Sequence, residues 1–279
     1  MAAFAVEDVF VKAASASLPI AQTLIIFGLG GALVFAFITI FNGERLYVRD
    51  VVSLPMRFRV LFEILGRLFF VLAIALAPLS TATVILQATP IVVVAGAALI
   101  FGEKVGWRRW TAIILGLLGV VVIIRPGADS FSMLSVLAVL GMLGFAGRDL
   151  ASRAAPASLS TSLLGLYGFL SVVVAGLLFS VWERAPFLWP EFSVWLYLSG
   201  AIVFGVAAYS SLMKAMRTGE VSAVTPFRYT RLLFGIGFGV LLFDEHLDLA
   251  MLIGSGLIVV SGLFILWSGR RVQLPRWQR

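Results

Sequence analysis

Two arginines, Arg228 and Arg231, stand inside an apolar stretch that runs from residue 221 to 243. A guanidinium group binds a carboxylate through two parallel hydrogen bonds. A charge at the centre of a bilayer costs about 2.5–3.5 kcal/mol on insertion scales, so two arginines one turn apart need a reason. No acidic residue lies within four positions of Arg231. We predict that both arginines face a cavity and bind a substrate carboxylate. The alternative is a structural arginine locked to Glu7 or to backbone carbonyls.

A second apolar stretch, residues 80–101, has polar residues at the matching depth. At an offset of 142 residues, Gln87 and Thr89 fall opposite Tyr229 and Arg231. A proline follows Thr89 directly, and a proline can interrupt the hydrogen-bond ladder of a membrane helix. These four side chains are therefore predicted to share one level of the same binding site.

A charged segment near the start of the chain recurs in its second half. FAVEDVFVKAASASL at residues 4–18 returns as FAGRDLASRAAPASL at residues 145–159, with eight of fifteen positions identical. Glu7 falls opposite Arg148, so the repeat loses its symmetry there. Intramembrane carboxylates usually serve a function. We expect Glu7 either to meet a substrate ammonium group or a proton, or to pair with an arginine across the cavity.

Other charges in the apolar stretches have a partner one helical turn away. An acid and a base at i and i+4 on a helix attract each other weakly. The sequence therefore predicts three pairs that neutralise themselves on their own helices: Asp8–Lys12, Glu63–Arg67 and Asp149–Arg153.

Phe145 and Tyr209 could form an aromatic wall of the cavity, although aromatic side chains in such stretches more often face lipid or core. The chain has no cysteine and one histidine, which excludes disulfide, thiolate and zinc–thiolate chemistry. We expect no metal site and no cofactor.

Composition defines the class of protein. Hydrophobic residues make up 61% of the 279 residues, charged residues 13%, and the mean hydropathy is +1.07. Soluble domains carry about 25% charged residues, so this composition is typical of a polytopic membrane protein. The sequence predicts ten spans, near residues 1–16, 18–41, 60–77, 80–101, 110–125, 131–152, 159–181, 192–213, 221–243 and 250–268. The first is short, and we expect the native N-terminus to extend beyond Met1.

The basic residues predict an orientation. Fifteen of the 21 lysines and arginines, Arg59 and Arg148 among them, fall on one side of these spans, two on the other (Arg125 and Arg184), and four inside spans. Short loops rich in lysine and arginine face the cytoplasm. Both termini should therefore be cytoplasmic, in the inner (plasma) membrane. The net charge of +7 is thereby explained without a nucleic-acid partner.

Two copies of five spans must cross the membrane in opposite directions, because five is odd. The sequence thus predicts an all-α membrane protein with a 5+5 inverted repeat around a central cavity. Residues 1–127 form the first repeat, residues 131–270 the second, and residues 271–279 a basic cytoplasmic tail. Inverted repeats with a site between them are typical of alternating-access transporters. Glycine motifs such as Gly235-xxx-Gly239 allow close helix packing, and a homodimer is one use the sequence leaves open.

Two segments resemble the ten-helix EamA-type members of the drug/metabolite transporter superfamily. They are APLSTATVILQATPIVVVAGAALIFGEKVGWRRWTAIILGLLGVVVIIRPG at residues 77–127 and VTPFRYTRLLFGIGFGVLLFDE at residues 224–245. The resemblance implies an inverted-repeat fold with a central cavity. It also implies transport of amino acids or other small metabolites, often outward, while a nearby branch takes up S-adenosylmethionine.

The prediction is therefore a secondary transporter for small carboxylate-bearing metabolites, amino acids first and export favoured. One alternative is uptake of a larger zwitterion such as S-adenosylmethionine. The other is a membrane-embedded enzyme, against which stands the lack of a nucleophile motif in the sequence. The chain also has no G-x-x-x-x-G-K-[ST] nucleotide-binding motif. The expected partners are an amino acid-like substrate and the lipid bilayer.

Overall fold

A computed structural model describes residues 1–101, 107–124, 133–218 and 230–270, and these are helical apart from short connections. The helices are α1 (Ala2–Ser15), α2 (Ile20–Phe41), the short 3-10 helix η1 (Arg49–Val52), α3 (Leu54–Leu76), α4 (Leu79–Leu86), α5 (Thr89–Phe101), α6 (Trp107–Ile124), α7 (Met133–Arg153), α8 (Thr161–Glu183), α9 (Phe192–Thr218), α11 (Thr230–Phe243) and α12 (Leu249–Arg270). The described part is thus all-α, as the sequence predicts.

Five helical stretches of the described residues are long and apolar enough to cross a membrane. They are Ile20–Phe41, Leu79–Ile100, Leu134–Arg153, Thr161–Glu183 and Phe192–Ala215. Trp110–Ile123, Phe234–Phe243 and Leu249–Phe264 are apolar but shorter. The predicted spans 1–16 and 60–77 correspond to α1 and α3, which carry several charges each. The count of ten spans stays a prediction.

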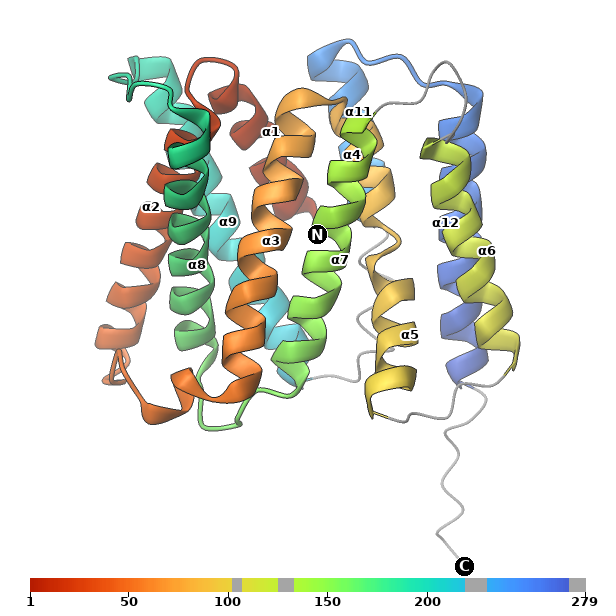
Figure 1. The fold of residues 1–279 in the computed structure, drawn as a ribbon, viewed down its shortest axis with the longest axis horizontal. Coiled ribbons are helices and arrows are strands. Elements are labelled where there is room, and N and C mark those ends of the chain that lie inside the picture. The colour runs from red at the N-terminus through yellow and green to blue at the C-terminus, as the bar shows by residue number, and fades with distance from the viewer. Residues whose placement is uncertain (102–106, 125–132, 219–229, 271–279) are drawn as a thin grey trace, which may run out of the picture.

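The helices pack in antiparallel and crossing pairs that lie side by side in Figure 1. The pairs with the most extensive packing are α3 with α7, α2 with α8, α6 with α12, α1 with α9, and α4 with α11. Phe27, Phe35, Phe169 and Tyr209 form an aromatic core between α2, α8 and α9, with ring centroids 5.1–6.1 Å apart.

The tightest helix contact joins α3 to α7. A Cβ atom added to Gly144 would overlap the backbone N and Cα of Gly66 and come within 3.1 Å of the Phe62 carbonyl oxygen. Small residues let two helix backbones approach this closely. The glycines therefore fix the distance between α3 and α7, the helices that carry Arg67 and Arg148.

Carboxylates satisfy helix N-termini at one end of the bundle. Glu183 accepts hydrogen bonds from the backbone N–H groups of Ile20 (3.0 Å) and Ala21 (2.9 Å), at the start of α2. Glu245 does the same for Leu79 (2.5 Å) and Ser80 (2.9 Å), at the start of α4. The first amide groups of a helix have no partner within it and favour negative charge.

Lys12 lies at this same end. Its ammonium group donates to the carbonyls of Ile74 and Ala77, both at 2.9 Å, and lies 3.7 Å from Glu245. The predicted Asp8–Lys12 pair is therefore wrong. The last carbonyls of α3 have no partner within that helix, and they offer the ammonium group better contacts than a surface i,i+4 pair would.

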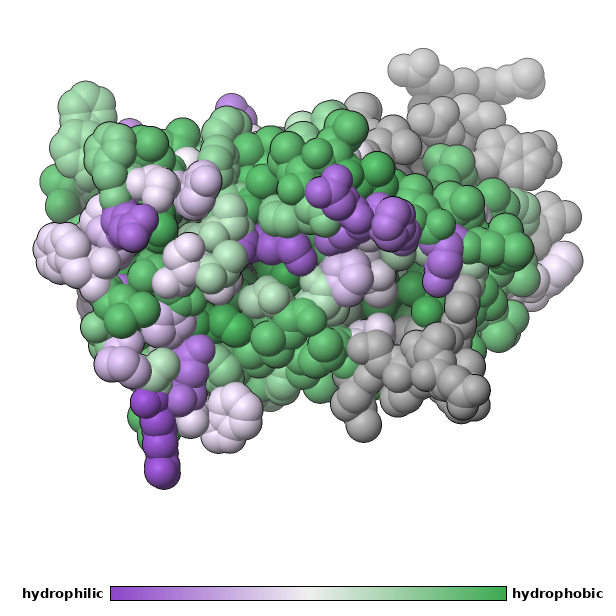
Figure 2. All heavy atoms as spheres, turned by 90° about the horizontal axis from the view of Figure 1, so that it is seen from above, coloured by the Kyte–Doolittle hydropathy of each residue, from purple (hydrophilic) through white to green (hydrophobic). Residues whose placement is uncertain are grey.

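The outer surface is suited to lipid. Leu33, Phe37 and Phe41 follow one another at four-residue spacing on α2 and are 69–81% exposed. A row of large apolar side chains this exposed is typical of a surface that faces lipid and not water. In Figure 2 hydrophobic side chains make up most of the end face, and hydrophilic ones gather in a band across it. The charged residues described next are instead buried between the helices.

Candidate binding site

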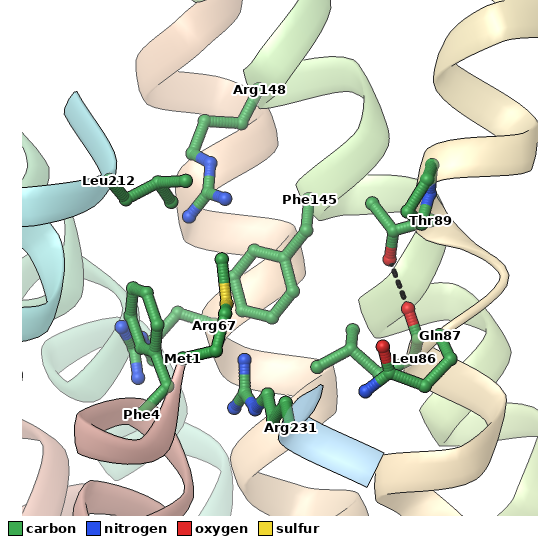
Figure 3. Close-up of a pocket in the computed structure, with 11 residues that line it drawn as sticks. Met1, Phe4, Arg67, Leu86, Gln87, Thr89, Phe145, Arg148, Leu212 and Arg231 are labelled. Atoms are coloured by element: carbon green, nitrogen blue, oxygen red, sulfur yellow. Dashed lines mark hydrogen bonds between the residues drawn. The ribbon is translucent and has the colours of Figure 1, made fainter. Parts of the chain in front are cut away.

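A pocket lies in the middle of the helix bundle, where α1, α3, α4, α5, α7, α9 and α11 meet. Its lining residues are Met1, Phe4, Arg67, Leu86, Gln87, Thr89, Pro90, Phe145, Arg148, Leu212 and Arg231. The guanidinium groups of Arg148 and Arg231 point into the same space from opposite sides in Figure 3. The cavity volume is about 40 Å³, room for a few water molecules at roughly 10–15 Å³ each. In this conformation the pocket has room for a polar group such as a carboxylate, but not for a whole metabolite.

Arg231 enters the pocket from the first turn of α11. Its Nε and Nη2 atoms lie 3.1 and 2.5 Å from Oδ2 of Asp8 on α1. The guanidinium also lies over the rings of Phe4 (5.1 Å) and Phe70 (5.4 Å). Cation–π contacts of this kind strengthen when water is excluded. Arg231 thus has an acidic partner, but on a different helix.

Arg67 enters from α3. Its Nη1 lies 2.6 Å from Oε1 of Glu7 on α1, so Arg67 pairs with Glu7 and the predicted Glu63–Arg67 pair is wrong. Glu7 is fully buried. Within the described part of the chain, its second oxygen, Oε2, and Nε of Arg67 have no hydrogen-bond partner. Both groups keep capacity for a further hydrogen bond.

Arg148 enters from α7 and serves two carboxylates. Its Nη2 and Nε atoms donate to Oδ1 of Asp149 at 2.8 and 3.0 Å, and its Nη1 lies 3.4 Å from Oε1 of Glu63 on α3. The ring of Phe145 lies 4.7 Å from the guanidinium carbon. Arg148 is only 4% exposed, although its position near the end of a span placed it among the cytoplasmic basic residues. That assignment is wrong.

A second polar cluster lies behind Arg148, away from the lining of the pocket. The hydroxyl of Tyr209 donates to Oε2 of Glu63 at 3.0 Å and accepts from Nη2 of Arg59. Arg59 also donates to the Leu164 carbonyl and to Oγ of Ser152, both at 3.0 Å. Arg59 has no exposed surface, so its assignment to a cytoplasmic loop is wrong as well.

The charges of the two clusters balance. Arg59, Arg67, Arg148 and Arg231 carry four positive charges, and Glu7, Asp8, Glu63 and Asp149 carry four negative ones. Ion pairs in an apolar interior are tolerated when each charge has a well-placed partner. Every pocket arginine is thus held by a carboxylate of the protein itself, which a substrate carboxylate would have to displace.

The helix break predicted near Pro90 is present. α4 ends at Leu86 and α5 begins at Thr89. Proline has no N–H to donate to the carbonyl four residues earlier, which is that of Leu86. The hydroxyl of Thr89 donates to this carbonyl instead, at 2.5 Å (Figure 3). The break places Gln87 and Thr89 on the wall of the pocket.

Four predicted site residues line the pocket together: Gln87, Thr89, Phe145 and Arg231. Glu7 lies behind Arg67, and Tyr209 lies in the second cluster. Arg228 and Tyr229 lie outside the described residues. Sequence reasoning missed Arg67, Arg148 and Phe4 as lining residues. The exchange of Glu7 for Arg148 between the two copies of the repeat was the available signal for Arg148.

Comparison with known proteins gives one family. The model of the EamA-like transporter family matches residues 1–125 and again residues 133–267. A riboflavin transporter from Vibrio cholerae is 28% identical over 222 residues, covering 78% of this chain and 73% of the relative. An S-adenosylmethionine uptake transporter from Rickettsia felis is 25% identical over 221 residues (76% and 71%). A pseudopaline exporter from Pseudomonas aeruginosa is 28% identical over 268 residues (92% and 90%).

The fold is also found in solved structures. One crystal structure superposes with a TM-score of 0.67 at 19% sequence identity, and the match covers 98% of both chains. At this identity the likeness concerns the fold alone.

Proposed function

This chain belongs to the EamA-like transporter family, and from that premise we propose that it is a secondary transporter whose central pocket binds the carboxylate of a small metabolite, amino acids first. Members of the family and the named relatives are transporters, not enzymes. The membrane-embedded enzyme is therefore set aside.

The observation that carries the proposal is the meeting of three arginines in one buried pocket: Arg67, Arg148 and Arg231. Guanidinium groups bind carboxylates bidentately, and burial strengthens that attraction because the effective dielectric constant is low. Arg148 and Arg231 are the proposed anchors of the substrate carboxylate. Gln87 and Thr89 lie on the same wall, and Phe145 supplies an aromatic surface.

A substrate ammonium group has a candidate partner too. The Oε2 atom of Glu7 is buried, and Glu7 contacts Arg67, which itself lines the pocket. An amino acid would then bridge the arginines and Glu7. Tyr229 and Arg228, by their spacing from Arg231, remain proposed members of the site, and Tyr209 acts through the second cluster.

Packing supports the proposed 5+5 inverted repeat. At the repeat offset of 141–142 residues, α1 is equivalent to α7, α2 to α8, α3 to α9, α5 to α11 and α6 to α12. The pair α1–α9 then exchanges with α7–α3, and α2–α9 exchanges with α8–α3; all four pairs are packed. The pairs α2–α8 and α6–α12 map onto themselves. Rocking of residues 1–127 against residues 131–270 is the motion that such a repeat allows.

Uptake of S-adenosylmethionine is the second candidate, because relatives carry that name at 24–26% identity. This molecule also bears an α-amino acid group, so the same arginines would bind it. Export stays the first choice of direction, since the exporter relative matches 92% of the chain.

Counterflow in proteoliposomes tests the proposal. Proteoliposomes that contain the purified chain are loaded in turn with each unlabelled amino acid, with S-adenosylmethionine or with riboflavin. Entry of the same compound in labelled form is then followed. We expect exchange of at least one amino acid and none of its methyl ester, because the ester cannot bind an arginine bidentately. Equal exchange of the ester would contradict carboxylate recognition, and exchange of S-adenosylmethionine alone would favour the second candidate.

Orientation in the inner membrane has its own test, since the absence of cysteine gives a clean background for labelling. Tyr47 (63% exposed) lies in the connection between α2 and α3, and Trp189 (88% exposed) in the connection between α8 and α9. These two connections are at opposite ends of the bundle in Figure 1. We expect a membrane-impermeant thiol reagent to label Trp189→Cys in intact spheroplasts and Tyr47→Cys only after the membrane is opened. The reverse pattern would contradict cytoplasmic termini.

A further inference from the structure

We propose that Glu63 is the proton-binding residue that couples transport to a proton gradient, with Arg148 as the link between this carboxylate and the substrate. The proposal rests on the proposed function, because it needs a substrate carboxylate in the pocket. It assigns a coupling ion and the group that holds it.

Among the buried carboxylates of the described residues, Glu63 has the longest contact with its arginine. Its distance to Arg148 is 3.4 Å, beyond the usual 2.7–3.2 Å of an N–H···O hydrogen bond. The other arginine–carboxylate contacts measure 2.6 Å for Glu7, 2.8 Å for Asp149 and 2.5 Å for Asp8. The side chain of Glu63 itself has no exposed surface. It is thus the buried carboxylate that loses its cation most readily.

Arg148 is shared between the pocket and Glu63. Asp149 holds Arg148 through Nε and Nη2, while Nη1 is directed at Glu63. A substrate carboxylate in the pocket can therefore take Nη1 and leave the contact with Asp149 intact. Glu63 then remains buried without a cation, a state costly enough that the carboxylate neutralises by binding a proton.

The charged and titratable groups around Glu63 come from several helices. On α3 itself Arg59 and Arg67 are the nearby cations, α7 adds Arg148 and Asp149, and α9 adds the hydroxyl of Tyr209. On α1, Glu7 is paired with Arg67 and Asp8 with Arg231. On α8, the Leu164 carbonyl accepts a hydrogen bond from Arg59. The Tyr209 hydroxyl touches Glu63 on one side and Arg59 on the other, and Arg59 binds Ser152. Tyr209 is thus the hydroxyl that can pass a proton to Glu63, whereas Arg59 cannot, because a guanidinium group does not release its proton.

Each transport cycle moves one proton with one substrate molecule. One proton leaves water and binds Glu63 as one substrate carboxylate binds Arg148. Both leave on the opposite side of the membrane, where Arg148 returns to Glu63 and the proton returns to water. Proton and substrate therefore move in the same direction. A proton gradient directed inward drives uptake and opposes export, so export, the first choice of direction above, proceeds only where the outward substrate gradient exceeds the proton gradient.

A transport experiment tests the coupling. The probe is the amino acid, or S-adenosylmethionine, that shows counterflow in wild-type proteoliposomes. We expect an acidic outside medium to drive its accumulation, with matching alkalinisation of the medium. Glu63→Gln should keep counterflow but lose the response to the gradient. Glu183→Gln, a helix-capping carboxylate far from the pocket, should keep both. A gradient response in Glu63→Gln, or none in wild type, would overturn the proposal.

A second experiment needs no substrate and so separates this inference from the proposed function. In Arg148→Gln the cation is absent permanently, and infrared spectroscopy at neutral pH should show the C=O stretch of a protonated carboxyl group that wild type lacks. The band should lose intensity in Arg148→Gln/Glu63→Gln, and any band that remains is that of Asp149, which also loses its contacts with Arg148. Absence of the band from the single variant, or an unchanged intensity in the double variant, would contradict proton binding by Glu63. Glu63→Gln is nearly isosteric, so the transport experiment remains decisive even if Arg148→Gln lowers the yield.

Discussion

Arg231→Leu is expected to reduce the yield of folded protein strongly, and a second substitution, Asp8→Asn, is expected to restore the yield but not transport. Asp8 is 2% exposed, and the Nε and Nη2 atoms of Arg231 lie 3.1 and 2.5 Å from its Oδ2 atom. Removing one partner of a buried ion pair costs about 3–5 kcal/mol, because the other charge stays buried and unpaired. Asparagine removes that charge, yet the guanidinium proposed to bind substrate is still missing.

Thermal unfolding in detergent and counterflow of the same preparations check this prediction. Arg231→Lys is the matched control: it keeps the charge beside Asp8 but loses the bidentate fork, so the yield should stay near normal while transport weakens. A normal yield of Arg231→Leu would contradict the structural role of the ion pair. Transport by the double variant at the wild-type rate would instead contradict substrate binding by Arg231.

The sequence predicts the depth at which the site lies, but not which charged residues form ion pairs there. Gln87, Thr89 and Arg231 lie around one pocket as the repeat offset indicated, and the break before Pro90 follows from its missing N–H. The prediction of i,i+4 pairs failed because an acid–base pair on the solvent-exposed face of one helix contributes only about 0.2–0.5 kcal/mol. Between buried helices the more favourable contacts are those that cross from one helix to another, as Arg231 does to Asp8.

Two arginines show why loop charges are hard to assign from sequence. Arg59 and Arg148 stand near predicted span ends, where a basic side chain usually reaches toward water. The structure turns both inward, to the Leu164 carbonyl and to Asp149. Removing these two from the fifteen basic residues assigned to one side leaves thirteen against two, so the orientation argument keeps its sign. Only the packing partners of α3 and α7 decide which arginines are buried.

Gly144→Ala is expected to abolish transport and to lower stability by more than the roughly 1–3 kcal/mol typical of overpacking. The added Cβ would meet the backbone of Gly66, and backbone cannot move aside as a flexible side chain can. α3 and α7 must then separate, which pulls Arg67 away from Phe145 and Arg148, its neighbours across the pocket.

Gly256→Ala in α12 is the matched control for this substitution. It makes the same chemical change in a helix, but among the described residues nothing beyond its own helix backbone lies within 4 Å of the new Cβ. Alanine there should be neutral or stabilising by about 0.5–1 kcal/mol, since glycine is a poor helix former. Thermal unfolding and counterflow of the two variants separate helix contact from helix propensity. If Gly144→Ala transports like Gly256→Ala, then α3 and α7 do not touch through their glycines, and the pocket between them needs another geometry.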